Sequence, residues 1–219
     1  MTISATTQGL RMGVATSTSR PTVPFDGQVI SETDTDSLQV YKGSAWAPVS
    51  GLQFISKTTI TSTAATTISN IFTSTYNDYR INITIGGVTD SNKLRMQLTT
   101  GGTPVTSGYA AGCFIGDYSS GAPTLLNYGY GESANLVLGY VPNSTTQNAN
   151  IFLDCYGPQA TQKTAINGLT TSVWSGAANA GGMFQGFLDA TTSYDGIKIY
   201  NSAGTAMTGT VTVYGYAKA

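Results

Sequence analysis

The sequence predicts an all-β protein, in which a small N-terminal β-hairpin or meander precedes an antiparallel β-sandwich with a jelly-roll-like number of strands. Three observations carry this prediction. Apolar and polar residues alternate along many short segments, which is the pattern of half-buried strands. Gly, Asn, Asp and Ser separate these segments at intervals of roughly 10 to 17 residues, as in sandwiches. Helix-favouring Glu and Lys are scarce, and alanine-rich stretches end in glycines.

The clearest alternation lies before the middle of the chain. Three isoleucines alternate with Arg, Asn and Thr between Tyr79 and Gly86, and Leu94, Met96 and Leu98 alternate with Arg and Gln in the next segment. Glycine, Asp and Asn residues that suit a turn connect the two segments. We therefore expect these segments to form an antiparallel pair of strands within a larger sheet.

The same pattern predicts the other strands of the sandwich. Ile151, Leu153 and Cys155 have the alternation of a half-buried strand, and so do Val211 and Val213. In chain order, the strands predicted from Gly51 onward are 52–60, 66–71, 79–86, 93–99, 109–116, 134–141, 149–156, 164–174, 183–189, 196–201 and 209–217.

The N-terminal residues are predicted to be extended. Residues 1–20 are small and polar, and we expect them to form an arm that a partner subunit holds in place. Pro21 and Pro24 keep residues 20–24 extended, because proline fixes its own φ and disfavours helix in the residue before it.

A small meander follows this arm. Short strands are predicted at 28–32 and 38–42, and Trp46 is expected to cap the ribbon. Strands this short bury too little area to be stable alone, so the meander must pack on the main domain, a second copy or a host structure. We therefore divide the chain into residues 1–50, for attachment, and 51–219, for the sandwich.

Composition narrows the classes of function. Charged residues make up only 10% of the chain, and ten basic against eleven acidic residues give a net charge of -1. Without a basic stripe, no nucleic-acid partner is predicted. No segment has the length and hydrophobicity of a membrane helix or the pattern of a signal peptide. Cys113 and Cys155 are expected to be buried free thiols, and the charge-poor surface suits a subunit that packs against copies of itself.

The absence of histidine removes the commonest general base and most metal-site chemistry. Paired carboxylates are the remaining route to catalysis, as in glycosidases. The candidates are the acids Glu32, Asp34 and Asp36, or pairs such as Asp117 with Glu132 and Asp154 with Asp189. We expect these acids to lie in solvated turns instead. No catalytic residue and no cofactor is predicted.

One acidic segment is similar to part of an oxygen-ligand calcium loop. It contains Glu32, Asp34 and Asp36 at alternate positions. The central glycine and the distal glutamate of such loops are missing. No metal site is therefore predicted here.

Aromatic residues provide the candidate ligand contacts. Glycines flank Tyr128 and Tyr130 and would expose their rings, which could then stack on a sugar or pack on a neighbouring protein. Trp174 is the third candidate. Packing of these rings along the sandwich edges is the alternative interpretation.

Two stretches in the first half of the chain contain further motifs. The first contains Arg20-Pro-x-x-Pro24, Gly27-Gln-x-Ile30-x-Glu-Thr-Asp-Thr35 and Leu38-x-Val-Tyr-x-Gly43-x-Ala-Trp46. It is similar to a segment that precedes β-rich domains in structural proteins of tailed bacteriophages, namely minor tail, tail-fibre, head-fibre and decoration proteins. The second contains Phe72-x-x-x-Tyr76-x-x-Tyr79-Arg80-Ile81, Leu94-x-Met-x-Leu98 and Gly101-Gly102-Thr103, and it is similar to the opening of β-sandwich domains in the same proteins.

The resemblance implies a non-enzymatic virion protein, namely a short tail fibre, a fibre adaptor, or a capsid decoration or head-fibre protein, assembled in the host cytoplasm. It implies a homotrimer that attaches to other tail or capsid proteins by residues 1–50 and presents the sandwich for assembly or for contact with a host-surface glycan or protein. The candidate attachment and oligomer-interface residues are Arg20, Pro21, Pro24, Val29, Ile30, Leu38, Val40 and Trp46. The alternative is a virion-associated carbohydrate-active enzyme that uses paired carboxylates.

Overall fold

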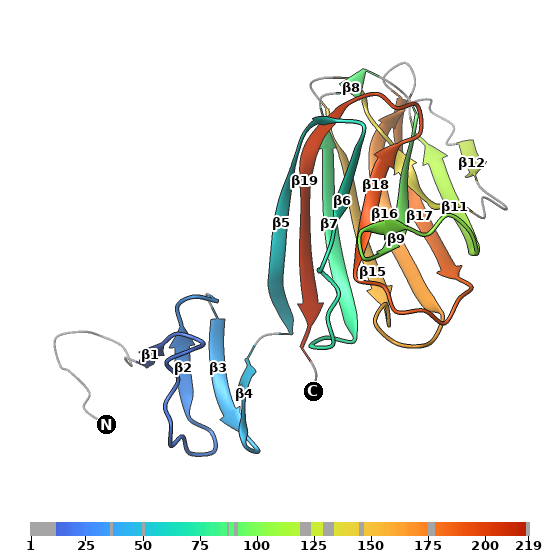
Figure 1. Ribbon diagram of the computed structural model, residues 1–219. Helices are drawn as coiled ribbons and strands as arrows, with labels where there is room; N and C mark the ends of the chain where they lie inside the picture. The colour runs from blue at the N-terminus through green and yellow to red at the C-terminus, as the bar shows by residue number, and fades with distance from the viewer. Residues whose placement is uncertain are drawn as a thin grey trace. The chain divides into compact units, whose positions relative to one another are not determined.

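The computed structural model confirms the all-β prediction. It describes residues 12–35, 37–49, 51–86, 88–89, 92–118, 124–128, 134–144, 147–174 and 178–217. Every regular element in these residues is a β-strand, and most of the strand pairs are antiparallel (Figure 1). None of the described residues forms a helix that is long and apolar enough to cross a membrane.

The chain divides into two compact units, with the division between Phe54 and Ile55. The first unit contains a four-stranded sheet in the order β1-β2-β3-β4. Its strands are β1 (Gly13–Ala15), β2 (Val29–Glu32), β3 (Ser37–Lys42) and β4 (Ala45–Pro48).

Residues 13–15 correct the prediction of an extended arm. They form β1, which pairs in parallel with β2. Ala15 is buried, and its carbonyl accepts a hydrogen bond from the backbone of Thr33. Trp46 also has a larger role than a cap, because it lies within β4 and packs edge-on against Tyr41 of β3.

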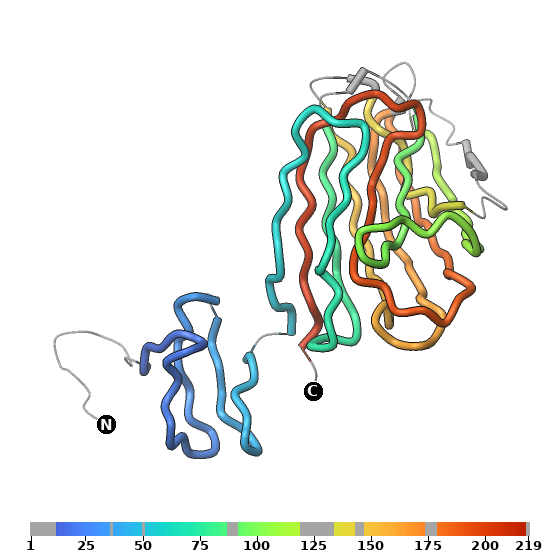
Figure 2. The backbone as a smooth tube through the Cα atoms, viewed as in Figure 1, coloured from blue at the N-terminus to red at the C-terminus, as the bar shows by residue number. Residues whose placement is uncertain are grey.

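The second unit is built on two main sheets, and Figures 1 and 2 show the course of their strands. The larger sheet has eight strands in the order β12 (Thr124–Tyr128), β11 (Tyr109–Asp117), β17 (Ala178–Leu188), β16 (Thr164–Trp174), β15 (Ala149–Tyr156), β7 (Asp78–Gly86), β19 (Met207–Tyr216) and β5 (Leu52–Thr63). The smaller sheet has the order β10 (Thr103–Pro104), β9 (Lys93–Thr100), β18 (Gly196–Asn201) and β6 (Ala65–Ile68), and β13 (Leu136–Tyr140) also pairs with β9. A separate two-stranded ribbon joins β8 (Val88–Thr89) to β14 (Asn143–Ser144).

One hydrophobic core joins the two main sheets. The larger sheet contributes the isoleucines of β7 and the inward residues of β15 and β19, while the smaller sheet contributes Leu94, Met96 and Leu98 of β9 and Ile197 and Ile199 of β18. All these side chains are buried. The two sheets therefore form a sandwich, as the alternation predicts; the jelly-roll connectivity stays a prediction.

The predicted pairing of 79–86 with 93–99 is wrong. β7 pairs with β15 and β19 in the larger sheet, whereas β9 pairs with β18, β13 and β10 in the smaller one. Both strands bury their apolar residues in the same core, but from opposite sides. The period-2 pattern identifies the buried face of a strand and does not identify its partner.

Several strand boundaries also differ from the predicted ones. β15 has the predicted bounds, but β17 begins at Ala178 and not at residue 183. Its first residues include Gly181 and Gly182, which pair with Thr171 and Thr170 of β16. Gly182 lies so close to the backbone of β11 that any Cβ there would overlap the carbonyl oxygen of Phe114, which explains the glycine within this strand.

Candidate functional site

The sheet of the first unit has two different faces. Ile30 and Glu32 of β2 and Gln39 of β3 lie on one face and are buried. Val14, Val29 and Leu38 lie on the other face and are exposed, together with the partly buried Val40 and Ala47. We call this second set the aliphatic face. An exposed aliphatic face on so small a sheet is a candidate contact surface.

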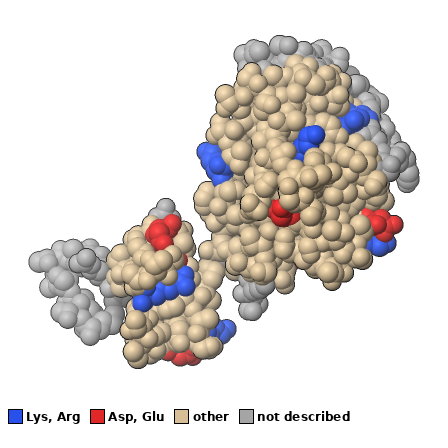
Figure 3. Space-filling model, in the orientation of Figure 1, with Lys and Arg blue, Asp and Glu red and all other residues tan. Residues whose placement is uncertain are grey.

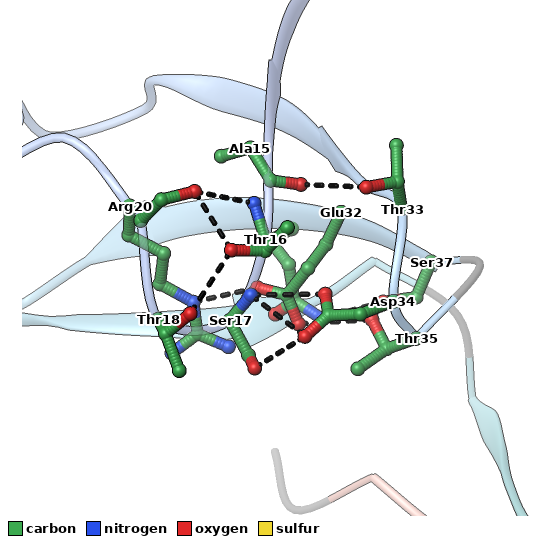
Figure 4. A network of polar contacts seen from close by, with 12 residues as sticks. Ala15, Thr16, Ser17, Thr18, Arg20, Glu32, Thr33, Asp34, Thr35 and Ser37 are labelled. Carbon is green, nitrogen blue, oxygen red and sulfur yellow. Dashed lines mark hydrogen bonds and ion pairs between the residues drawn. The ribbon is translucent and has the colours of Figure 1, made fainter.

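A polar network fixes the loop between β1 and β2 (Figure 4). The guanidinium of Arg20 donates to the carboxylate of Glu32 at 2.6 Å, and Glu32 is only 1% exposed. This hydrogen bond holds the pKa of Glu32 below its usual value, although burial opposes the shift. Ser17 donates through both its backbone N–H and its hydroxyl to Asp34, and these bonds lower the pKa of Asp34.

These contacts explain the role of the acidic side chains in the segment that is similar to a calcium loop. Glu32 and Asp34 are engaged by Arg20 and Ser17, while Asp36 lies outside the described residues. Among the residues that the structure describes, no three His, Cys, Asp or Glu side chains gather as metal ligands would. The network engages the carboxylates of both described acids, Glu32 and Asp34, so neither is free to bind a metal.

The eight predicted attachment residues all lie in the first unit. Val29 and Leu38 are exposed on the aliphatic face, and Val40 is the cross-strand partner of Val29. Ile30 points to the opposite face and is 1% exposed, so it stabilises the sheet and is not accessible to a partner. The other four predicted residues are Arg20, Pro21, Pro24 and Trp46, all of them partly buried.

The outward-facing surface of the eight-stranded sheet carries the largest set of exposed apolar side chains in the described residues. The cross-strand register places four of them in one line across four adjacent strands, and each is between 44% and 58% exposed. We call this line the apolar row: Phe114 of β11, Met183 of β17, Leu169 of β16 and Phe152 of β15.

A polar row runs beside the apolar row, two residues further along each strand. It contains Gln185 of β17, Asn167 of β16, Asp154 of β15 and Arg80 of β7, in register with Gly112 of β11. The side chains of Gln185 and Asn167 are exposed and have no hydrogen-bond partner within the described residues. These two neighbouring amides can therefore bind an incoming group.

Arg80 and Asp154 form the charged end of the polar row. Arg80 donates to both carboxylate oxygens of Asp154, at 2.9 and 2.8 Å, and the Tyr216 hydroxyl donates to Asp154 at 2.7 Å. Burial would raise the pKa of Asp154, but the hydrogen bonds from Arg80 and Tyr216 outweigh it and leave this pKa below the usual value. Burial, together with the bond to Asp154, raises the pKa of Tyr216 to about 12. The charges are thus paired and the cluster is neutral.

A third line completes the surface, again two residues further along the strands. This mixed row contains the large side chains Phe187 and Tyr156 and the small ones Ala110 and Ala165. A groove of about 630 Å³ lies over the small residues and Gly112, with Phe114, Phe187 and Tyr156 among its walls. A second groove of about 390 Å³ continues along the polar row and shares Asn167 and Gln185 with the first. We call the apolar, polar and mixed rows together the outer face.

The predicted ligand-contact aromatics do not belong to the part of the outer face that can be described. Tyr128 ends β12 and Trp174 ends β16, but their side chains lie outside the described part of the chain, and so does Tyr130 entirely. Tyr118, which was not predicted, covers Gly116 and Gly181 at the end of β11 and donates a hydrogen bond to the Gly181 carbonyl at 3.3 Å.

The candidate carboxylate pairs do not form an acid–base pair in the described residues. Asp154 is paired with Arg80, whereas Asp189 is paired with Lys163. Asp117 lies on β11, and Glu132 is outside the described residues. Both cysteines are buried free thiols, as predicted.

The sequence contains a signal for the outer face that alternation alone overlooks. In Ile151-Phe152-Leu153 an apolar residue occupies the position where a polar one is expected, and Met183 and Phe187 likewise precede the buried Phe184 and Leu188. Such doubled apolar positions indicate a strand with two apolar faces. Comparison of the chain with protein-family models and with curated proteins finds no match.

Proposed function

We propose that this chain is a non-enzymatic structural protein of a bacteriophage virion. It attaches by its N-terminal unit and presents the sandwich for assembly or for contact with the host surface. The proposal combines the resemblance of residues 20–103 with one observation, the outer face, on which large apolar side chains stay exposed in a row across four strands. Contiguous exposed apolar surface marks contact sites in proteins.

The distribution of charge also supports a protein that works by surface contact. Figure 3 shows few charged side chains on the face that it presents, in keeping with a chain of which only 10% is charged. The acids in the grooves do not favour hydrolysis, because Asp154 is held ionised by Arg80 and cannot serve as a general acid near neutral pH. No second function is favoured by a specific contact.

Incorporation into particles tests this proposal. The chain and a variant that lacks residues 1–50 are expressed in cells infected by a phage whose own copy of this gene is disrupted. We expect the full chain to sediment with purified particles and the truncated chain to remain unassociated, while its circular dichroism still shows a folded β protein. Equal incorporation of both chains would contradict attachment by the N-terminal unit.

A parallel assay tests the enzymatic alternative. Purified protein is incubated with envelope polysaccharide of the host, and reducing ends are measured. We expect no release of reducing ends. Release that is lost in Asp154→Asn or Asp117→Asn would replace the structural proposal with a carbohydrate-active enzyme.

A further inference from the structure

The outer face is complementary to itself. Its three rows are evenly spaced, because on every strand the apolar, polar and mixed rows are two residues apart. The polar row therefore lies on the midline, with one apolar-rich row on each side. A two-fold axis that runs along this midline, between two facing sheets, would place the apolar row of each copy over the mixed row of the other.

Under this operation, large residues meet small ones on two of the four strands. Phe114 of one copy faces Ala110 of the other on β11, and Leu169 faces Ala165 on β16, because each pair shares a strand at equal distances from the polar row. The groove of about 630 Å³ lies over these two alanines. The groove over Ala110 and Ala165 of one copy could therefore receive the side chains of Phe114 and Leu169 of the other.

The remaining contacts are also compatible with a pair of copies. On β17 Met183 would face Phe187, and on β15 Phe152 would face Tyr156, which are contacts between large apolar groups. Along the midline, the free amides of Asn167 and Gln185 would meet the same amides of the other copy, and each amide supplies both donors and an acceptor. Arg80 and Asp154 also lie on the midline and would meet their own counterparts, but each Arg80 is paired with Asp154 of its own copy, so the contact receives no net charge.

We infer that the outer face is the contact surface for a second copy of this chain, packed sheet on sheet about a two-fold axis. Aligned packing of two sheets is a common arrangement in β proteins. Phe, Met, Tyr and Arg, which dominate this surface, are the residues enriched in protein interfaces. A sugar would stack on the aromatic rings but would not use the aliphatic Leu169 and Met183 at the centre of the apolar row.

The available area suits a stable pair. Aromatic side chains bury 150–250 Å² each when fully covered, so the four partly exposed aromatic side chains of the outer face offer roughly 400 Å², to which Leu169 and Met183 add. With the alanines and the polar row, this approaches the roughly 800 Å² that each partner contributes to a standard interface. The inference rests on the proposed structural role, and it replaces the trimer implied by the resemblance with a pair at this surface.

Sedimentation equilibrium of the full chain tests the inference. We expect a mass twice the 22.8 kDa of one chain and a mass of one chain for Leu169→Lys. Thr67→Lys is the matched control, because Thr67 is exposed on β6 of the smaller sheet, and it should keep the mass of two chains. Thermal unfolding by circular dichroism verifies that all three proteins are folded.

Cross-linking tests the position of the axis without disturbing the apolar row. Asn167 lies on the midline and would meet its own counterpart, so Asn167→Cys should be linked into dimers by a short bismaleimide. Thr67→Cys should not be linked, and the native cysteines are buried. A wild-type mass of one chain, a mass of three chains, or a pair that survives Leu169→Lys would overturn the inference.

The test separates this inference from the proposed function. A monomer that still incorporates into particles refutes the pairing and leaves the structural role intact. A monomer that binds host polysaccharide through Leu169 identifies the outer face as a receptor site and also refutes the pairing. Failure of both pairing and incorporation refutes both proposals.

Discussion

Replacement of Asp154 by Asn should destabilise the sandwich at neutral pH and have a smaller effect in acid. Asp154 accepts two hydrogen bonds from Arg80 and one from Tyr216, and its side chain is 16% exposed. A hydrogen bond to a charged group contributes about 1.5–3 kcal/mol. Because Arg80 is 40% exposed, water can solvate the freed guanidinium, and we expect a net loss of about 1–2 kcal/mol.

The pH dependence follows from the pKa of Asp154. Burial would raise this pKa, but the hydrogen bonds from Arg80 and Tyr216 leave it below the usual value. A carboxyl with a lowered pKa in the folded state stabilises the protein above its unfolded pKa, and this contribution is lost as the pH falls through the folded pKa. The difference between wild type and Asp154→Asn should therefore be complete at pH 7 and smaller at about pH 2.

Urea denaturation at both pH values measures this difference. Asp189→Asn is the matched control, because Asp189 pairs with Lys163 at 2.5 Å but is 62% exposed. An exposed pair should contribute at most about 1 kcal/mol at pH 7, and less in acid, where Asp189 is protonated. The reasoning is refuted if Asp154→Asn costs no more than the control at pH 7, or costs as much at pH 2 as at pH 7.

Three further predictions concern the packing of the sandwich. Ile83→Ala should lower the free energy of unfolding by about 2–5 kcal/mol in urea denaturation, because this side chain is 1% exposed in the core; a loss below about 1 kcal/mol would contradict the packing. Gly182→Ala should lower the thermal midpoint by forcing β17 away from β11, whereas Gly51→Ala, with no atom within 4 Å of its Cβ, should leave it unchanged; equal midpoints would contradict the close approach of the two strands. Cys113 and Cys155 should react with a thiol reagent only in denaturant, because both are buried and burial raises the pKa of the Cys155 thiol; labelling of the folded protein would argue against this burial.

Local pattern predicts most of the longer strands of this chain and the face that each of them buries in the core. The alternation in residues 149–156 predicts β15 with its observed bounds, because every second residue enters the core. The partner of each strand, in contrast, cannot be predicted from local pattern. β7 and β9 have the same alternation and a turn-like connection, yet the chain crosses from one sheet to the other between them. The sequence pattern does not reveal this crossing, because the same side chains of β7 and β9 would be buried whether the two strands paired in one sheet or lay in two facing sheets.

The candidate site was harder to predict than the fold. Phe152, Leu169 and Met183 are far apart in the sequence, and only the register of two strand pairs brings them into line. Alternation also assigns such positions to solvent, where the expected residue is polar. β1 was overlooked for a related reason, because three residues carry no periodicity and their partner in β2 lies beyond a proline-rich loop.

The place of β19 in the larger sheet affects how the protein is made. β19 lies between β7 and β5, although β5 ends at Thr63 and β19 begins at Met207. During translation, β5 therefore emerges from the ribosome long before the strand beside which it will settle. Until then its backbone donors and acceptors, and the neighbouring edge of β7, are open to pairing with other nascent chains. A ribosome that stalls before residue 207 would release a polypeptide whose larger sheet cannot be completed, and quality-control proteases would be expected to remove it.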